Sequence, residues 1–185
     1  GHQYLQPGPG WGGSCFPKDT RAFLRLAESG GYDFRFLGGV IAVNEEQFNR
    51  VADKVSKAVG GDLSGRTVAV WGLTFKAGTD DMRDSPSLSV IDRLLADGAT
   101  VRAFDPTVAT HRGGLDERVA VGSDPLVVCK GADVVVVLTE WDEFADIDPA
   151  EVATLMVGRG VVDTRNLLDR DAWAGHGFDY HGIGR

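Results

Sequence analysis

Strand-like and helix-like segments alternate along most of this chain, and this order restricts its fold more than any other feature. Four short runs of β-branched and apolar residues have the length and composition of buried parallel strands. These runs are residues 67–72, 100–104, 134–138 and 160–163. Between the first two, Ser85 and Pro86 form a helix start, and apolar residues then recur on one face up to Gly98. The order predicts an α/β fold with a doubly wound, Rossmann-like parallel sheet.

The part of the chain before residue 65 has a different pattern. It opens with a stretch dominated by Gly and Pro, which predicts a loop. Helices are predicted over residues 19–29 and 44–59, and the second begins with an Asn three positions before a Gln, as in a capping box. We therefore expect two parts: residues 1–64, which are helical, and residues 65–185, which form the α/β domain and include a short helix over residues 126–129.

The composition excludes several classes of protein. A net charge of −8 argues against a general nucleic-acid binder. Cys15 and Cys129 form no disulfide framework and fit a reducing cytoplasm. The longest apolar run, residues 134–138, is too short to cross a bilayer, and no export signal opens the chain. Because the chain begins with Gly1 rather than Met, we expect it to be part of a longer protein.

Cys15 is the strongest candidate for chemistry. It follows the glycine-rich loop and precedes a predicted helix, where backbone amides and the helix dipole favour a thiolate. Lys18 adds positive charge, and Asp19 could position a water molecule or hold a proton. This arrangement suits covalent catalysis through sulfur. The alternative is that Cys15 is an inert residue in a turn. Cys129, which lies in an apolar helical segment, is expected to be inert.

Three glycines in the same loop imitate a dinucleotide-binding fingerprint. Gly8, Gly10 and Gly13 have the G-x-G-x-x-G spacing. The fingerprint has meaning only between a strand and a helix, whereas two prolines interrupt it here and no strand precedes it. We reject it as an NAD site.

The segment after the first strand holds two basic residues, Lys76 and Arg83. Ligands of open α/β sheets bind beyond the carboxyl ends of the strands. Both side chains are therefore placed to meet phosphates, together with the helix N-terminus near Ser85. The alternative is an ordinary solvated loop.

Two motifs resemble those of the UDP-glucose/GDP-mannose dehydrogenase family. Residues 4–8 (YLQPG) and 13–19 (GSCFPKD) resemble its catalytic segment, with the cysteine in place. The G-L-x-F-K run at residues 72–76, followed by Arg83, resembles the opening of its C-terminal domain. Similar likenesses cover residues 139–144 (TEWDEF) and 163–166 (DTRN).

The resemblance implies a role for each matching residue. Cys15 and Asp19 would be catalytic, and Lys18 and Arg83 would contact the cofactor NAD, Arg83 at its pyrophosphate. Phe75 and Lys76 would meet the uridine diphosphate. The loop before the cysteine would wrap the substrate through Tyr4, Leu5, Gln6, Pro7, Gly8 and Gly12. Arg165 is a further candidate for substrate contact, although some relatives carry a second Arg where this chain has Asn166.

The implied reaction is a two-step oxidation of UDP-glucose to UDP-glucuronate, each step transferring a hydride to NAD, with a thiohemiacetal and a thioester on Cys15. Residues 1–64 would be the last part of a central helical domain, whose long helix contributes to a homodimer. The family's NAD-binding domain and its catalytic Lys and Asn would precede this chain. We therefore expect the chain to be inactive alone.

Three alternatives remain. Another family member could act on GDP-mannose or UDP-N-acetylmannosamine, although the aminosugar type tends to have His before the cysteine and this chain has Ser14. A non-catalytic nucleotide-sugar-binding module would carry an inert cysteine. A Cys–His hydrolase lacks a recognisable histidine partner, and the four histidines show no metal-ligand spacing, so we expect no metal site.

Overall fold

The computed structural model describes residues 5–110 and 113–184, and it contains one parallel sheet in the order β3-β2-β1-β4-β5-β6. The strands are β1 (Thr67–Trp71), β2 (Thr100–Phe104), β3 (Ala120–Val121), β4 (Val134–Val137), β5 (Gly160–Asp163) and β6 (Asp179–Gly182). The helices are α1 (Phe16–Ser29), α2 (Arg35–Ala58), α3 (Pro86–Ala96), α4 (Pro125–Cys129), α5 (Asp142–Ala145), α6 (Pro149–Leu155) and α7 (Arg170–Gly175). The predicted doubly wound, Rossmann-like sheet is confirmed.

The central strands are apolar throughout because both faces of the sheet are covered. In β1, Val68 and Val70 point to one face and pack in a core with residues of α2 and α3. Ala69 and Trp71 point to the other face, where they pack with α4 and with Trp173 of α7. Alternation of side chains along each strand thus divides the apolar residues between two cores.

The four strands that the sequence predicts are all present, and the structure adds two at the edges. β3 has only two residues, and β6 (Asp179–Gly182) is polar along most of its length. Edge strands face a neighbour on one side alone, so they need no continuous apolar run. The helix start at Ser85 is also confirmed, since its side chain accepts a hydrogen bond from the Ser87 amide.

The prediction of a helix start at Asn44 is wrong. α2 runs unbroken from Arg35 to Ala58, and Asn44 lies inside it, with only 7% of its surface exposed. Its amide instead holds the backbone of Trp11, accepting from the nitrogen at 2.8 Å and donating to the oxygen at 3.1 Å. α1 likewise begins at Phe16, three residues before the predicted start.

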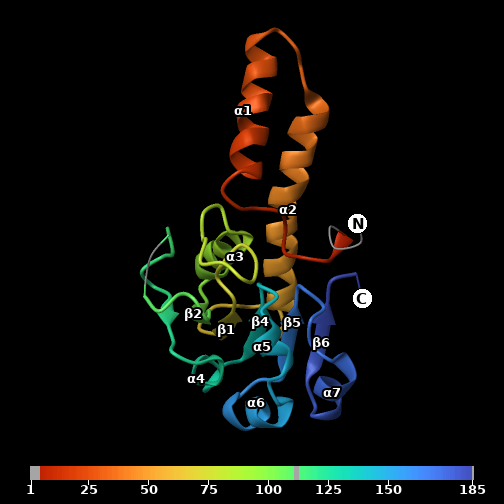
Figure 1. The fold of residues 1–185 in the computed structure, drawn as a ribbon. Coiled ribbons are helices and arrows are strands. Elements are labelled where there is room, and N and C mark those ends of the chain that lie inside the picture. The colour runs from red at the N-terminus through yellow and green to blue at the C-terminus, as the bar shows by residue number, and fades with distance from the viewer. Residues whose placement is uncertain (1–4, 111–112, 185) are drawn as a thin grey trace.

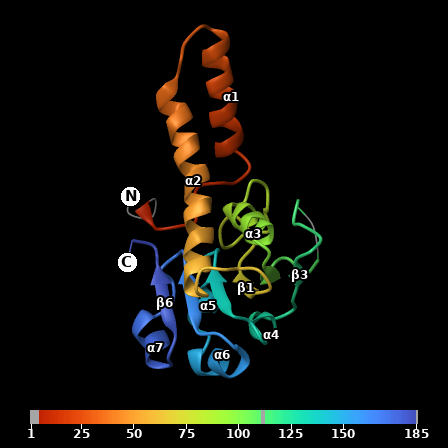
Figure 2. The same cartoon turned by 180° about the vertical axis from the view of Figure 1, so that it is seen from behind.

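The long helix α2 joins the two parts of the molecule. In Figures 1 and 2 its first half pairs with α1 in a hairpin that extends away from the sheet, and its second half lies against the sheet. Val51 and Val55 of that second half are fully buried in the same core as β1 and β4. The division at residues 64 and 65 stays a prediction. Among the described helices, none has the length and apolar character needed to cross a membrane.

We predict that Asn44→Ala lowers the free energy of unfolding by about 1–2 kcal/mol, because the Trp11 backbone loses two hydrogen bonds. Alanine is the better helix former, so a helix-propensity effect alone would have the opposite sign. Glu46→Ala, at an exposed position of α2, is the control and should change stability by less than about 0.5 kcal/mol. Urea denaturation followed by circular dichroism measures both. Equal stability of the two variants would contradict the prediction.

Candidate functional site

The strand order brings three loops together at the carboxyl edge of the sheet. β1 and β4 are neighbours, yet their chains continue to opposite sides, which makes the space beyond their ends a switch point where ligands bind in such folds. The loops after β1, β4 and β5 all begin there. They carry the predicted residues Phe75, Lys76, Arg83 and Arg165.

A buried carboxylate holds the loop after β1. Asp105, at the end of β2, is 2% exposed, and its Oδ2 accepts hydrogen bonds from the Leu73 and Thr74 amides at 2.8 and 3.1 Å. The Thr74 hydroxyl and Trp141 Nε1 donate to the same oxygen, at 3.0 and 3.2 Å. Burial raises the pKa of Asp105, but the hydrogen bonds outweigh it, so the pKa lies below its usual value. The backbone that leads into Phe75 is therefore fixed by an ionised group.

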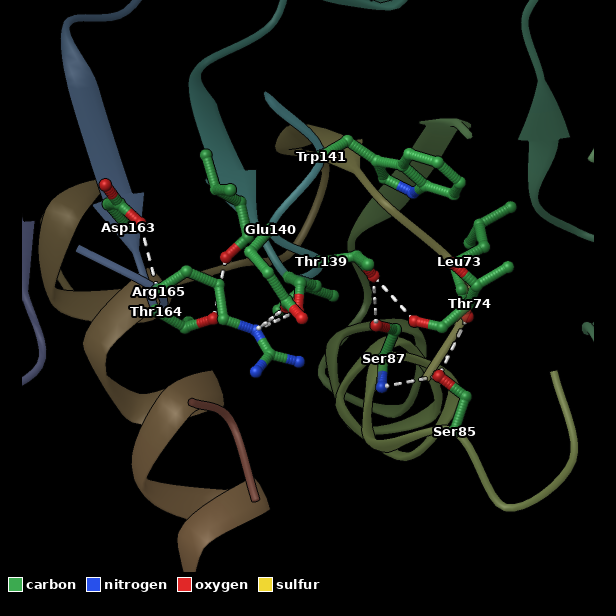
Figure 3. A network of polar contacts seen from close by, with 12 residues as sticks. Leu73, Thr74, Ser85, Ser87, Thr139, Glu140, Trp141, Asp163, Thr164 and Arg165 are labelled. Carbon is green, nitrogen blue, oxygen red and sulfur yellow. Dashed lines mark hydrogen bonds and ion pairs between the residues drawn. The ribbon is translucent and has the colours of Figure 1, made fainter. Parts of the chain in front are cut away.

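Hydroxyl groups close the same loop from the side of β4 and α3 (Figure 3). The Thr139 hydroxyl donates to the Thr74 carbonyl at 2.6 Å, and the Ser85 hydroxyl donates to the Leu73 carbonyl at 2.8 Å. Thr139, Thr74 and Ser85 are all almost fully buried. The base of the loop after β1 is thus buried and held by hydrogen bonds, while its tip extends to the solvent at Lys76.

Arg165 is held in a fixed position at the end of β5. Its Nε donates to the Leu138 carbonyl at 2.9 Å and lies 3.1 Å from Oε2 of Glu140, as Figure 3 shows. That carboxylate oxygen is buried and accepts no hydrogen bond from a described residue, so charge alone holds it. Burial lowers the pKa of Arg165, and the carboxylates of Glu140 and Asp163 oppose this shift. The guanidinium packs against Gly8, where a Cβ would lie 2.8 Å from Nη1.

The glycine-rich loop crosses this edge of the sheet and is docked at several points. Gln47 of α2 donates to the Gly8 carbonyl at 3.4 Å, near the place where Gly8 meets Arg165. At the other end, the Gly13 amide donates to the Asp84 carbonyl at 3.1 Å. Gly13 has a φ of +93°, which favours glycine, and it packs so closely against the Phe75 ring that a Cβ would lie 3.0 Å from it. A Cβ at Gly12 would overlap the Asp84 carbonyl and Pro86.

Cys15 stands at the end of this loop as the N-cap residue of α1, and it is exposed. Its Sγ lies 3.8 Å from the Ser14 hydroxyl. Lys18 and Asp19 follow in the first turn of α1 and form an exposed ion pair of 3.3 Å. The loop therefore presents an exposed thiol two residues after Gly13, which packs against the Phe75 ring.

The other predicted residues fall into two groups. Lys76 lies over the Phe75 ring, with Nζ 5.2 Å from its centroid, and Arg83 is exposed and paired with Asp81. Gln6, Gly8 and Arg165 line a cavity of about 760 Å³ that extends along the first half of α2, where Phe36, Val40 and Val43 form an apolar wall.

For three other residues of the predicted loop, the role in substrate binding stays a prediction. Tyr4 lies outside the described residues, Leu5 is 80% exposed, and Pro7 is partly exposed.

The remaining reactive side chains contribute little to this site. Cys129 is fully buried, and burial raises the pKa of its thiol to about 12, as expected for an inert residue. His176 contacts the Ala172 carbonyl, and His181 pairs with Asp179, while the other two histidines lie outside the described residues. Within residues 5–110 and 113–184, no three His, Cys, Asp or Glu side chains gather in a way that could hold a metal ion.

Sequence reasoning missed Asn44 as a clamp on the loop, and it gave no role to Asp105 or Asp81. Asp105 had one signal, because an acidic residue at the end of a second strand is a familiar position in Rossmann folds. Asp81 also had a signal, because its partner Arg83 lies only two residues further on. Asn44 had none, since its partner Trp11 is distant in sequence.

Two domains of one protein family match this chain. Residues 69–170 match the UDP-binding domain of the UDP-glucose/GDP-mannose dehydrogenase family, and residues 1–46 match the central domain of that family. UDP-glucose 6-dehydrogenases from Rhizobium meliloti and Bacillus subtilis are 41% and 39% identical to it over its whole length. The chain spans 42% and 40% of these relatives, respectively.

Solved structures give the same picture. A UDP-glucose dehydrogenase from Pyrobaculum islandicum superposes with a TM-score of 0.80 at 35% identity, over 99% of this chain and 40% of that one. An NDP-N-acetyl-D-galactosaminuronic acid dehydrogenase from Methanosarcina mazei superposes with a TM-score of 0.85 at 28% identity, over 97% of this chain and 39% of that one.

We predict that Asp105→Asn lowers the free energy of unfolding at pH 7 by about 2–4 kcal/mol, because an amide cannot accept from all of these donors. The folded-state pKa of Asp105 is depressed, so its stabilisation is complete above the unfolded value of about 4. That stabilisation is lost as the pH falls through the folded value, and the gap between the two proteins should close below about pH 4. Urea denaturation between pH 3 and 7 measures this, with exposed Asp53→Asn as control. A gap independent of pH would contradict it.

Proposed function

The chain belongs to the UDP-glucose/GDP-mannose dehydrogenase family, and on this premise we propose that it forms the UDP-sugar-binding and cysteine-bearing part of an NAD-dependent UDP-glucose 6-dehydrogenase. One observation carries the proposal. The loop that ends at the exposed Cys15 is docked through Gly13 onto Phe75, so a thiol and a candidate diphosphate site share one edge of the sheet. We choose UDP-glucose because the residues around Cys15 resemble the UDP-glucose type and because similar relatives are named UDP-glucose 6-dehydrogenases.

The substrate's diphosphate would lie among the cations at this edge. Lys76 is exposed at the tip of the loop after β1, and Arg165 uses Nε internally, which leaves its Nη atoms for a ligand. The Phe75 ring would contact the nucleotide part. The loop of Tyr4, Leu5, Gln6, Pro7, Gly8 and Gly12 would line the substrate through its backbone. Packing within the protein already explains the glycines of this loop, because their backbone lies close to Arg165, Asp84 and Phe75.

NAD does not fit the sheet of this chain as it fits a dinucleotide-binding fold. The acid at the end of β2, Asp105, is the group that usually binds the ribose hydroxyl, but here it is buried and saturated with internal hydrogen bonds. Two exposed cations at the edge, Lys18 and Arg83, are suited to contact a pyrophosphate held elsewhere. We propose that another domain of the intact enzyme binds NAD, which accepts the hydrides when bound.

Cys15 would keep the intermediate aldehyde covalently bound. Its sulfur adds to the C6 aldehyde carbon and the thiol proton ends on the aldehyde oxygen, which gives a thiohemiacetal. Loss of a hydride from that carbon and a proton from that oxygen gives a thioester. Water then adds to the carbonyl, the carbon–sulfur bond breaks, the sulfur recovers a proton, and the carboxylate leaves. Asp19, one turn into α1, would hold the water that attacks.

We further propose the assembly that the family resemblance implies. Residues 1–64 would form the end of the central domain, residues 65–185 the UDP-sugar domain, and the exposed side of α2 part of a homodimer interface. Phe36 and Val43 on that helix are 77% and 57% exposed, which supports an interface there. The cytoplasm suits a free, reactive thiol.

In the intact enzyme, Cys15→Ala should lower the rate of UDP-glucuronate formation by about a thousandfold or more, because the aldehyde can no longer be captured. Binding of UDP should remain within about twofold of the original, since the thiol does not hold the diphosphate. Product analysis by mass spectrometry and calorimetric titration with UDP measure the two quantities. Undiminished two-step oxidation by the Cys15→Ala enzyme would contradict the proposed mechanism.

This chain by itself should bind UDP and produce no NADH from UDP-glucose and NAD. Lys76→Gln should weaken UDP binding about tenfold through loss of a charge-assisted hydrogen bond. Lys57→Gln, in the last turn of α2, is the matched control and should leave the affinity unchanged. Calorimetry and absorbance at the NADH band test these points. If the two variants bound UDP with equal affinity, the proposal that Lys76 contacts the diphosphate would be wrong.

A further inference from the structure

Asp81 and Arg83 form a two-pronged ion pair beside the cysteine loop. Arg83 Nε donates to Asp81 Oδ1 at 3.0 Å, and Nη2 donates to Oδ2 at 2.8 Å. The Arg83 amide adds a third bond to Oδ1 at 3.0 Å. The side chain of Arg83 is 73% exposed while that of Asp81 is 16% exposed, so the carboxylate is the anchored partner. Two guanidinium nitrogens are thereby engaged, which leaves Nη1 for an acceptor outside the chain.

Asp81 is also tied to the rest of the site. Its backbone carbonyl accepts a hydrogen bond from the Phe75 amide at 3.1 Å, and its amide donates to the Thr79 hydroxyl at 3.2 Å. Hydrogen bonds from Arg83 lower the pKa of Asp81 to about 2, and the Ser14 side chain adds a smaller contribution. Asp81 thus links the Phe75 turn to the exposed arginine.

The guanidinium that Asp81 holds belongs to the segment that is hydrogen-bonded to the cysteine loop. The pKa of Arg83 is raised, chiefly by its hydrogen bond to Asp81, and the charge of Cys15 contributes to the same shift. Arg83 and Cys15 come from different parts of the chain, and the Gly13–Asp84 bond holds their two segments together. A molecule that approaches Cys15 therefore meets the Arg83 guanidinium, whose positive charge is largely neutralised by Asp81.

We propose that Asp81 is a positioning residue that fixes the Arg83 guanidinium beside Cys15 and sets the charge met by molecules that react with the thiol. The arrangement offers a directed donor near the sulfur without a net positive field. An anionic product, such as the carboxylate released from a thioester, is then not retained by charge. This inference rests on the proposed function for its purpose, but the geometry and its test do not require turnover.

The chain contains a matched control for this ion pair. Asp116 and Arg118 repeat its spacing and geometry, with Nε to Oδ1 at 3.0 Å, Nη2 to Oδ2 at 2.8 Å and a backbone bond from the Arg118 amide. Hydrogen bonds from Arg118 likewise lower the pKa of Asp116 to about 2. This second pair follows Leu115 on the connection between β2 and β3 and lacks the interaction with Cys15.

The test compares alkylation of Cys15 by a neutral and an anionic reagent, iodoacetamide and iodoacetate, in the chain and its variants. The ratio of the two rates cancels changes in thiolate population and in loop mobility, which affect both reagents alike. Peptide mass spectrometry assigns the modification to Cys15 rather than to buried Cys129. The variants are Asp81→Asn, Asp81→Glu and Arg83→Gln, with Asp116→Asn and Arg118→Gln as controls.

Asp81→Asn should raise the iodoacetate-to-iodoacetamide ratio about two- to fivefold, because it leaves the arginine charge uncompensated near the thiol. Arg83→Gln should lower the ratio by a similar factor, and Asp81→Glu should restore it to the original value. The control variants should leave it unchanged. A ratio that stays constant in the Asp81 and Arg83 variants, or that moves equally in the controls, overturns the proposal.

The outcome is separable from the proposed function. If the ratio of alkylation rates stays constant and the Cys15→Ala enzyme is inactive, Asp81 has no positioning role, while the covalent mechanism through Cys15 is still supported. If the ratio shifts as predicted and the Cys15→Ala enzyme is active, the covalent mechanism is wrong, while the role of Asp81 in positioning Arg83 is still supported.

Discussion

The ionised side chain of Asp105 organises the candidate site because it fixes the one loop on which the other parts rest. Six hydrogen bonds reach its two oxygens, from Leu73, Thr74, Thr107 and Trp141. A buried carboxylate is tolerated only when its lone pairs are satisfied in this way. The loop after β1 cannot move at its base without exposing that charge to unpaired surroundings. The positions of Phe75 and Asp81 therefore depend on the hydrogen bonds of Asp105.

The same interaction shows how one sheet can serve a different ligand. In dinucleotide-binding folds the acid after β2 faces outward to a ribose and the first loop is a tight glycine turn. Here the first loop is long and the acid turns inward to support it. The strand order is unchanged, yet the groups that we propose to face the ligand are Lys76, Arg165 and the incoming glycine loop. Function in such folds depends on the loops at the switch point rather than on the sheet.

Docking of the cysteine loop depends on contacts from both parts of the molecule. Asn44 and Gln47 hold it from α2, while Asp84 and Phe75 hold it from the α/β domain. The glycines permit backbone to approach backbone and ring closely enough for these contacts to form. Because α2 is itself part of the sheet's core, the thiol is positioned relative to the strands without any linker between them.

The sequence by itself determined the parallel sheet, the helix start at Ser85 and the neighbourhood of Cys15. Those features depend on short-range patterns: apolar runs, N-caps and glycine-rich turns within a few residues. The tertiary structure alone decided that α2 begins at Arg35, that Asn44 clamps Trp11, and that Asp105 and Asp81 hold the loop after β1. Sequence reasoning placed a cap at Asn44 because asparagine commonly begins helices and Gln47 follows three residues later, as in a capping box. Contacts across the fold override such local preferences, since a buried polar group takes whatever partner packing brings to it.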